Sequence, residues 1–270
     1  MVKIYLDAGH GGTDGGASSN GIKEKDIVLN IVKKMKSKLN EYQDVQLNFT
    51  RETDVFLSLS ERTKKANNWN ADCFVSVHVN SATNTTARGY EDYRYSNAGQ
   101  STIAFQNVMH SEIMKQIGGL ISSDRGKKSA NYHVLRESKM KAILTENLFI
   151  SNSADANLLK TDSFLDKVAQ GHVNGLVAFY GLKKKANSTP PKEQPKDDGK
   201  LYKVQVGAYE DKENCDEMER VLIKDGFKPF VTYENKLYKL QVGAFSEKSN
   251  AEDLVKKLQS LGYRPFIKYE

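Results

Sequence analysis

The sequence predicts a layered α/β domain with a central sheet, followed by a small α+β domain of βαββαβ order. Strand-like and helix-like patterns alternate through residues 1–183, which is typical of α/β layers. Residues 184–200 hold three of the five prolines and no large apolar side chain, which indicates a linker. Residues 201–270 contain an internal repeat. We therefore expect two domains joined by this linker.

Short apolar runs and helical spacing define the elements of the first domain. Apolar or alternating runs predict strands at residues 2–6, 45–50, 73–79, 88–95, 132–135 and 142–146. Apolar residues at helical spacing predict helices at residues 26–39, 59–68, 102–117 and 165–179. In folds of this kind, ligands collect at the carboxyl ends of the strands, so we expect a functional site there.

The second domain consists of two copies of one unit, offset by 36 residues. Residues 202–209 (YKVQVGAY) recur as 238–245 (YKLQVGAF), and residues 226–231 (GFKPFV) recur as 262–267 (GYRPFI). Each copy begins with a strand pattern, continues with helical spacing and ends in a second strand. Side by side, the two copies form a four-stranded antiparallel sheet backed by two helices.

Composition excludes several classes of protein. The 270 residues are 39% hydrophobic and 27% charged, which excludes a disordered chain or a coiled coil. No run approaches the roughly 18–20 apolar residues of a membrane-crossing helix, so we expect no membrane insertion. Residues 1–10 have the pattern of a strand, so we expect synthesis in the cytoplasm without a signal peptide. The net charge of +6 permits approach to an anionic polymer without identifying one.

Two histidines and one glutamate stand at predicted strand or loop ends. His10 follows the first strand and His78 ends the third, while Glu24 follows a glycine-rich loop at residues 11–16. Two imidazoles and one carboxylate suit a catalytic zinc that keeps its fourth position for water. Glu146 ends the last apolar run and is the best candidate for the acid that moves protons. Spacing alone leaves open that each of these is an ordinary core or surface residue.

Seven motifs in order carry a resemblance to a known family. They are residues 6–12 (LDAGHGG), 20–26 (NGIKEKD), 50–51 (TR) with Asp54, 75–81 (VSVHVNS), 124–126 (DRG), 134–136 (VLR), and Glu146 with 149–152 (FISN). Together they resemble the zinc-dependent N-acetylmuramoyl-L-alanine amidases of type 3, across residues 1–180. The resemblance implies that His10, Glu24 and His78 bind Zn²⁺ and that Glu146 is the catalytic residue.

The family activity is hydrolysis of the amide between N-acetylmuramic acid and L-alanine of peptidoglycan. The resemblance therefore implies that zinc polarises the carbonyl while Glu146 takes the water proton and returns it to the leaving amine. Two departures from the family pattern lie at the ends of the predicted strand that carries Glu146. Lys141 stands where proline is usual, and Asn147-Leu148 stand where Leu-Gly is usual. If the family glycine needs a positive φ, Leu148 is strained there.

Five further polar residues receive roles from their chemistry and from the resemblance. Glu91 lies where the family often places a polar group near the cleft, and it is a candidate for binding substrate or supporting His78. Arg125 and Arg136 are candidates for binding the carboxylates of the stem peptide, because a guanidinium pairs bidentately with them. A structural salt bridge is the equal alternative for both. We expect Arg51 and Asp54 to form a structural ion pair.

The repeat in residues 201–270 resembles a SPOR domain, which implies binding to denuded glycan strands, the product of amidase action. Gln205 and Gln241 are the favoured glycan-binding residues, because by parity the glutamines share one sheet face and Tyr202, Val204 and Val206 the other. The aromatic residues of the repeated strands are further candidates. An RNA-recognition module is the alternative, but its aromatic-rich motifs are missing, so we expect no nucleic-acid partner.

Taken together, the sequence predicts a two-domain cell-wall hydrolase whose partners are peptidoglycan and its glycan strands. A zinc peptidase acting on wall peptides and a non-catalytic peptidoglycan-binding protein are the alternatives. Without a signal peptide, such an enzyme reaches the wall after lysis of the host or mother cell. A phage endolysin is slightly favoured over a sporulation autolysin.

Overall fold

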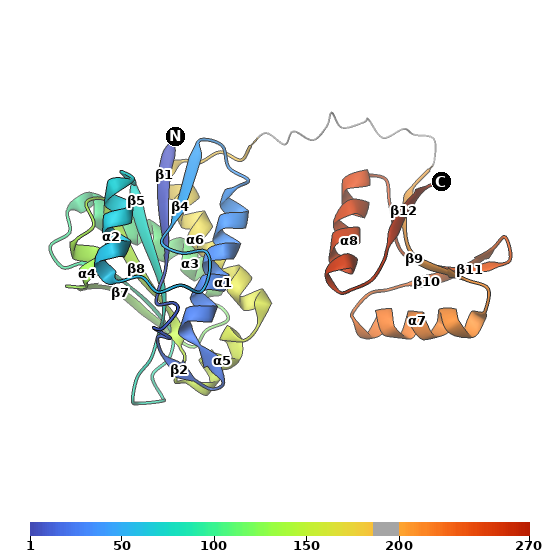
Figure 1. Cartoon of the computed structure of the whole chain (residues 1–270), viewed down its shortest axis with the longest axis horizontal. Helices are drawn as coiled ribbons and strands as arrows, with labels where there is room; N and C mark the ends of the chain where they lie inside the picture. Colours follow the sequence, from blue (N-terminus) through green and yellow to red (C-terminus); the bar gives the residue numbers. More distant parts are fainter. Residues whose placement is uncertain (186–199) are drawn as a thin grey trace. The chain divides into compact units, whose positions relative to one another are not determined.

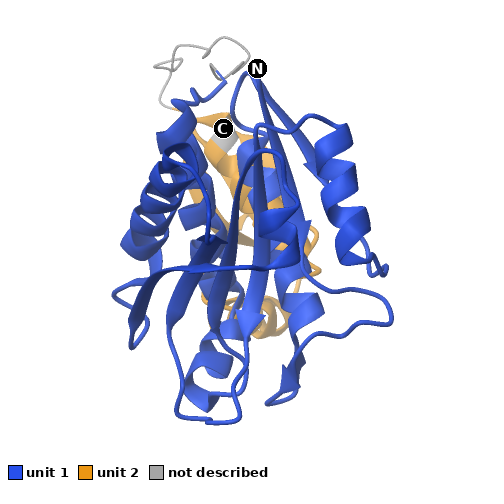
Figure 2. Cartoon of the chain, turned by 90° about the vertical axis from the view of Figure 1, so that its left-hand side faces the viewer, with its two compact units in different colours: residues 1–187 blue, residues 188–270 orange. Residues whose placement is uncertain are grey.

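The computed structural model describes residues 1–185 and 200–270, and the chain divides into two compact units. Figure 2 shows unit 1, Met1–Asn187, and unit 2, Ser188–Glu270, in different colours. Most of the predicted linker, residues 184–200, lies outside the described residues. Each unit contains one principal sheet with its own helices, so the predicted fold class, α/β followed by α+β, is confirmed.

Unit 1 is built on a six-stranded sheet in the order β4-β1-β5-β8-β6-β7. Its strands are β1 (Val2–Ala8), β4 (Val45–Phe49), β5 (Cys73–Asn80), β6 (Tyr90–Tyr95), β7 (Asp124–Ala130) and β8 (Lys141–Phe149). The first four in the sheet order run parallel, and β6 runs antiparallel to β8. The carboxyl ends of β1, β5 and β8 therefore meet at one edge of the sheet.

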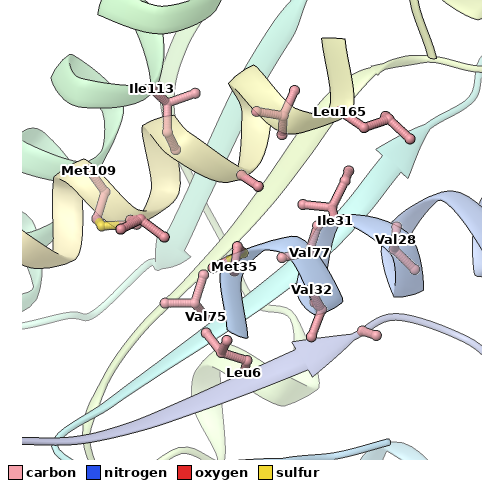
Figure 3. Close-up of a cluster of buried hydrophobic side chains, with 14 of the residues drawn as sticks. Leu6, Val28, Ile31, Val32, Met35, Val75, Val77, Met109, Ile113 and Leu165 are labelled. Atoms are coloured by element: carbon pink, nitrogen blue, oxygen red, sulfur yellow. The ribbon is translucent and has the colours of Figure 1, made fainter. Parts of the chain in front are cut away.

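Helices cover both faces of this sheet (Figure 1). They are α1 (Glu24–Leu39), α3 (Gln100–Ile117) and α6 (Asp162–Tyr180) on one face, and α2 (Leu59–Asn68) and α4 (His133–Arg136) on the other, with α5 (Ser153–Leu159) leading into α6. Leu6 and Val75 pack with Ile31 of α1 in the larger core (Figure 3), while Tyr5 and Phe74 face the smaller one. Because helices cover both faces of the sheet, its polar groups can contact a ligand at the ends of the strands.

The prediction of a strand at residues 132–135 is wrong, because this segment contains the one-turn helix α4. Val134 and Leu135 are 4% and 3% exposed, and both reach the smaller core, whereas a strand sends neighbouring side chains to opposite faces. The outermost strand of the sheet, next to β6, is instead β7, whose sequence DRGKKSA has no apolar alternation. An exposed edge strand needs few apolar side chains, so the hydrophobic pattern does not reveal it.

Unit 2 is a four-stranded antiparallel sheet in the order β10-β11-β9-β12, backed by two helices as predicted. Its elements are β9 (Tyr202–Tyr209), α7 (Lys212–Lys224), β10 (Phe230–Glu234), β11 (Leu237–Phe245), α8 (Lys248–Ser260) and β12 (Phe266–Tyr269). Val204 and Leu240 of the central strands pack with Leu222 of α7 and Leu258 of α8. In the parts of both units that are described, no helix has the length and apolarity needed to cross a membrane.

Candidate metal site and active-site cavity

The predicted site residues come from neighbouring strand ends and from the start of α1. In the register of β5 and β8, His78 lies directly beside Glu146. His10 follows β1, the strand on the other side of β5. Glu24 is the first residue of α1 and follows a short hairpin, β2 (Ser18–Ser19) and β3 (Ile22–Lys23). Four residues far apart in the sequence thus reach the same edge of the sheet.

His10, Glu24 and His78 converge closely enough to share one metal ion. One potential ligand atom from each lies within 4.8 Å of the others, and across residues 1–185 and 200–270 this is the one such group of three. Glu24 Oε1 lies 3.2 Å from His10 Nε2 and 2.9 Å from His78 Nδ1. The Val79 and Ala17 amides donate to the Glu24 oxygens. Burial alone would raise the pKa of Glu24, but the two histidines hold it well below its usual value.

The surroundings hold both imidazoles in place. Asp14 Oδ2 lies 2.8 Å from His10 Nδ1, which leaves Nε2 directed at Glu24. Gly9 lies against the His78 ring, since a Cβ at Gly9 would come within 2.3 Å of His78 Cε1. Two imidazoles and a carboxylate, with a second carboxylate behind one imidazole, match the donor set of a catalytic zinc site. The residues present therefore fit this ion.

Glu146 lies beside the histidines with an unpaired carboxylate oxygen. Its Oε2 is buried and has no hydrogen-bond partner in the described structure. Burial raises the pKa of Glu146 well above its usual value, and the charges of Glu24 and Glu91 raise it further. After Glu146, β8 has one more residue than β5 before pairing resumes at Phe149, and Leu148 adopts a φ of 71°. Leu148 thus keeps the left-handed conformation that was expected of a glycine, inside a β-bulge.

A cavity of about 620 Å³ opens over these residues. Its lining includes Asp7, His10, Asp14, Phe56, Leu57, Ser58, Leu59, Arg62, His78, Tyr132, His133, Val134, Leu144 and Glu146. The segment before α2 forms an apolar wall in which Phe56 is 53% exposed, and Tyr132 contributes a second exposed aromatic ring. Phe56, Tyr132 and His133 receive no role from the sequence patterns. Phe56 follows the predicted strand at residues 45–50, and an aromatic residue in such a strand-end segment is a signal that could have indicated it.

Glu91 lies next to Glu146 across β6 and β8, but its own carboxylate is fully engaged. Although only 2% exposed, it accepts hydrogen bonds from Arg125 Nε at 2.6 Å and from Asn80 Nδ2 at 2.8 Å, and it pairs with Lys128. Arg136 is exposed and pairs with Glu137 instead. Within the described residues, Glu91, Arg125 and Arg136 are not part of the cavity lining.

The expected ion pair between Arg51 and Asp54 is wrong. Arg51 is 3% exposed and donates to backbone carbonyls, whereas Asp54 accepts from the Gly12 amide and from Lys25 Nζ, both at 2.7 Å. A buried guanidinium with several donors is satisfied best by carbonyl groups that would otherwise lack partners. Asp54 nonetheless supports the same loop, because its carboxylate binds the Gly12 amide within the glycine-rich segment.

In unit 2, Gln205 and Gln241 lie side by side on the sheet face opposite the helices. Both are 3% exposed, and Gln241 Nε2 donates to Gly243 O at 3.1 Å. The strand register pairs Phe266 with Gln205, Gln205 with Gln241, and Gln241 with Phe230, so these four residues form one row across the sheet. Phe230 and Phe266 are 46% and 47% exposed. Their recurrence at the repeat offset of 36 residues is a signal of this row in the sequence.

Two family profiles match this chain. The profile described as N-acetylmuramoyl-L-alanine amidase matches residues 4–178, and the SPOR domain profile matches residues 198–269. The sporulation-specific N-acetylmuramoyl-L-alanine amidase of Bacillus subtilis (strain 168) is 45% identical over 232 residues, covering 86% of this chain and 84% of the relative. The endolysin of Bacillus phage SPP1 is 50% identical over 195 residues, covering 72% of this chain and 71% of the relative.

Solved structures of amidase domains are similar to unit 1. The catalytic domain of CwlV, an amidase from Bacillus (Paenibacillus) polymyxa var. colistinus, superposes with a TM-score of 0.64 at 34% identity. It is matched over its whole length and covers 68% of this chain. An N-acetylmuramoyl-L-alanine amidase from Clostridium difficile 630 gives a TM-score of 0.64 at 33% identity, covering 67% of this chain and 97% of that one.

Proposed function

This chain belongs to the N-acetylmuramoyl-L-alanine amidase family, and from that premise we propose that it is a zinc-dependent peptidoglycan hydrolase with His10, Glu24 and His78 as metal ligands. The observation that carries this proposal is the convergence of the three side chains beneath a cavity that also contains Glu146. The bond cleaved is the amide between the lactyl group of N-acetylmuramic acid and L-alanine. Because the matched relatives include a sporulation amidase and a phage endolysin, we propose that it acts on the wall after lysis of the cell that made it.

The residues of the cavity divide the reaction among them. His10, Glu24 and His78 would hold Zn²⁺, which when bound supplies Lewis acidity and lowers the pKa of water to about 7. Glu146 accepts the proton of the attacking water on its carboxylate and returns it to the nitrogen of the departing alanine. Burial raises the pKa of the Glu146 carboxyl group, which strengthens its carboxylate as a base toward the water proton. Asp14 fixes the orientation of the His10 ring throughout.

Digestion of purified peptidoglycan with and without a chelator tests this proposal. We expect new alanine amino termini without new reducing sugars, loss of this activity to the background rate on chelation, and recovery on addition of Zn²⁺. The products are measured by amino-terminal labelling and by a reducing-sugar assay. New reducing ends would identify a glycosidase, and new amino termini on other residues of the stem peptide would identify a peptidase.

The SPOR region binds peptidoglycan, and we propose that it selects denuded glycan strands through the row of Phe230, Gln241, Gln205 and Phe266. Two exposed aromatic rings at the ends of the row suit the C–H faces of sugars. The side-chain amides between them carry both donors and acceptors for sugar hydroxyls. The two-fold repeat of Phe and Gln matches a ligand that is itself a repeating chain.

Replacing Phe230 or Phe266 with alanine is expected to weaken binding to denuded glycan about 3- to 10-fold each, the loss of one stacking contact. Binding is measured by co-sedimentation of the full chain, freed of metal, with peptidoglycan that has been digested by an amidase. Ile223→Ala is the matched control, because Ile223 is 56% exposed on α7, a helix that packs against the opposite face. Equal binding by both phenylalanine variants and wild type would exclude this face.

A further inference from the structure

Two buried arginines lie directly behind the loop that carries His10, and the mechanism above does not use them. Arg51 follows β4 and Arg62 lies on α2, and each is 3% exposed. Between them they donate to the carbonyl oxygens of three consecutive residues, Ala8, Gly9 and His10. Buried carbonyls of a loop need donors, and here guanidinium groups supply them in place of backbone amides.

Arg62 binds the metal-site loop at the ligand residue itself. Its Nη2 donates to His10 O at 2.6 Å, and its Nη1 donates to Ala8 O and to Asp7 Oδ1, both at 2.8 Å. Asp7 is fully buried and also accepts from Ser76 Oγ at 2.6 Å. Burial alone would raise the pKa of Asp7, but Arg62 and Ser76 hold it below its usual value. The negative charge of Asp7 therefore balances the positive charge of Arg62 next to the loop.

Arg51 joins the two segments that carry the first two proposed ligands. Its Nη2 donates to Gly9 O, next to His10, and to Lys25 O, next to Glu24, each at 2.8 Å. One guanidinium group thus fixes the spacing between the loop after β1 and the first turn of α1. Its Nε donates to Ala8 O at 3.0 Å, which adds a second point of attachment on the loop.

The loop has a conformation that needs such support. His10 has a φ of 59°, in the left-handed region that residues other than glycine rarely adopt. Conformations of this kind persist where the surrounding structure fixes them. The hydrogen bond from Arg62 to the His10 carbonyl and the bond from Arg51 to the preceding carbonyl act on the two peptide groups that define this φ and ψ.

We propose that Arg51 and Arg62 form a guanidinium clamp that fixes the backbone of His10 relative to Glu24 and so preorganises the metal site. They are positioning residues, because their donors bind the protein's own backbone and Asp7. The inference rests on the proposed function of His10, Glu24 and His78 as metal ligands. A lysine retains the charge but carries one ammonium group, which cannot span the carbonyls and the carboxylate that the planar guanidinium joins.

The test compares Arg51→Lys and Arg62→Lys with the wild type as full chains. We expect zinc dissociation constants, measured by competition with a chromogenic chelator, to rise about 10- to 100-fold, the usual effect of losing support behind a metal ligand. The visible spectrum of the Co²⁺-loaded protein is expected to change in the same variants. Arg94→Lys is the control, since Arg94 lies on β6 and donates to Tyr95 O at 3.2 Å.

Hydrogen exchange of the amides of residues 9–16 in the zinc-free protein separates failure of the clamp from failure of the zinc site. We expect faster exchange in both lysine variants and unchanged exchange in the Arg94 variant. If Arg62→Lys does not fold, the result for Arg51→Lys alone tests the clamp, because this substitution leaves the ion pair of Asp7 and Arg62 intact. Unchanged exchange together with zinc binding within twofold of wild type overturns the clamp. If the wild-type protein binds no zinc, the proposed metal site is wrong. The hydrogen exchange of residues 9–16 then tests the clamp by itself.

Discussion

Glu146→Gln is expected to lower kcat about 10²- to 10⁴-fold, the usual contribution of a general acid–base residue, while zinc affinity stays within about twofold. This loss corresponds to about 3–5 kcal/mol of transition-state stabilisation. Glutamine has the shape of the protonated acid but cannot accept the proton of water. Because no hydrogen bond to Glu146 Oε2 is present, the substitution breaks no existing side-chain contact of that atom. The release of alanine amino termini from peptidoglycan gives the rate, and chelator competition gives the zinc affinity.

Glu137→Gln is the matched control for this substitution. Glu137 follows α4, near the cavity wall, but its side chain is exposed and paired with Arg136. We expect its kcat to remain at the wild-type value. If Glu146→Gln keeps more than about a tenth of the wild-type kcat, the effect is too small for the residue that moves the proton. His133 would then be the next candidate, because it lines the cavity and its Nε2 is buried without a partner in the described structure.

The positions of His10, His78 and Glu146 could be predicted because each follows an apolar run. In a sheet covered on both faces, strands have to be apolar, so the first polar residues after them mark the edge where ligands collect. Glu24 is harder to place from spacing alone, since it begins α1, and the preceding hairpin determines whether the start of α1 lies near the histidines. The family motifs assigned it, and the geometry of the Glu24 oxygens relative to both imidazoles is a separate observation from that assignment.

The role of the buried arginines could not be predicted in the same way. Arg51 and Arg62 bind mainly backbone carbonyls, which carry no sequence signal, so the sequence motif suggests only a pair of Arg51 with Asp54. Arg62 received no role at all, because its partner Asp7 is 55 residues away. Contacts of this kind depend on which loops the fold brings together, so local sequence patterns do not predict them.

Unit 2 shows the opposite situation, in which the sequence contained more information than was used. Parity placed Gln205 and Gln241 on one face, and the structure has them on the face away from the helices. The candidate aromatic residues of the repeated strands, Tyr202 among them, pack against the core instead. Phe230 and Phe266 recur at the same offset as Gln205 and Gln241, and comparing the two pairs would have suggested one symmetric row.

Gly9→Ala is expected to weaken zinc binding about 100-fold and to lower activity at limiting zinc accordingly, the upper end of the usual effect of disturbing the surroundings of a metal ligand. A Cβ at this position would lie 2.3 Å from His78 Cε1 and 2.6 Å from Nε2, well inside van der Waals contact. The backbone of His78 cannot retreat, because β5 is paired with β8 at this residue. The imidazole therefore has to rotate, which breaks its 2.9 Å contact with Glu24 Oε1.

Gly15→Ala, in the glycine-rich loop that follows His10, isolates this steric effect. A Cβ at Gly15 meets no heavy atom within 4 Å, so the ligand side chains keep their places. Both substitutions restrict the unfolded chain equally, so their common effect on stability cancels in the comparison. We expect zinc affinity within about twofold of wild type for Gly15→Ala, measured by the same chelator competition. Equal zinc affinity of the two alanine variants would mean that the His78 ring does not occupy the space beside Gly9, and that a site built on His10, Glu24 and His78 has the wrong geometry.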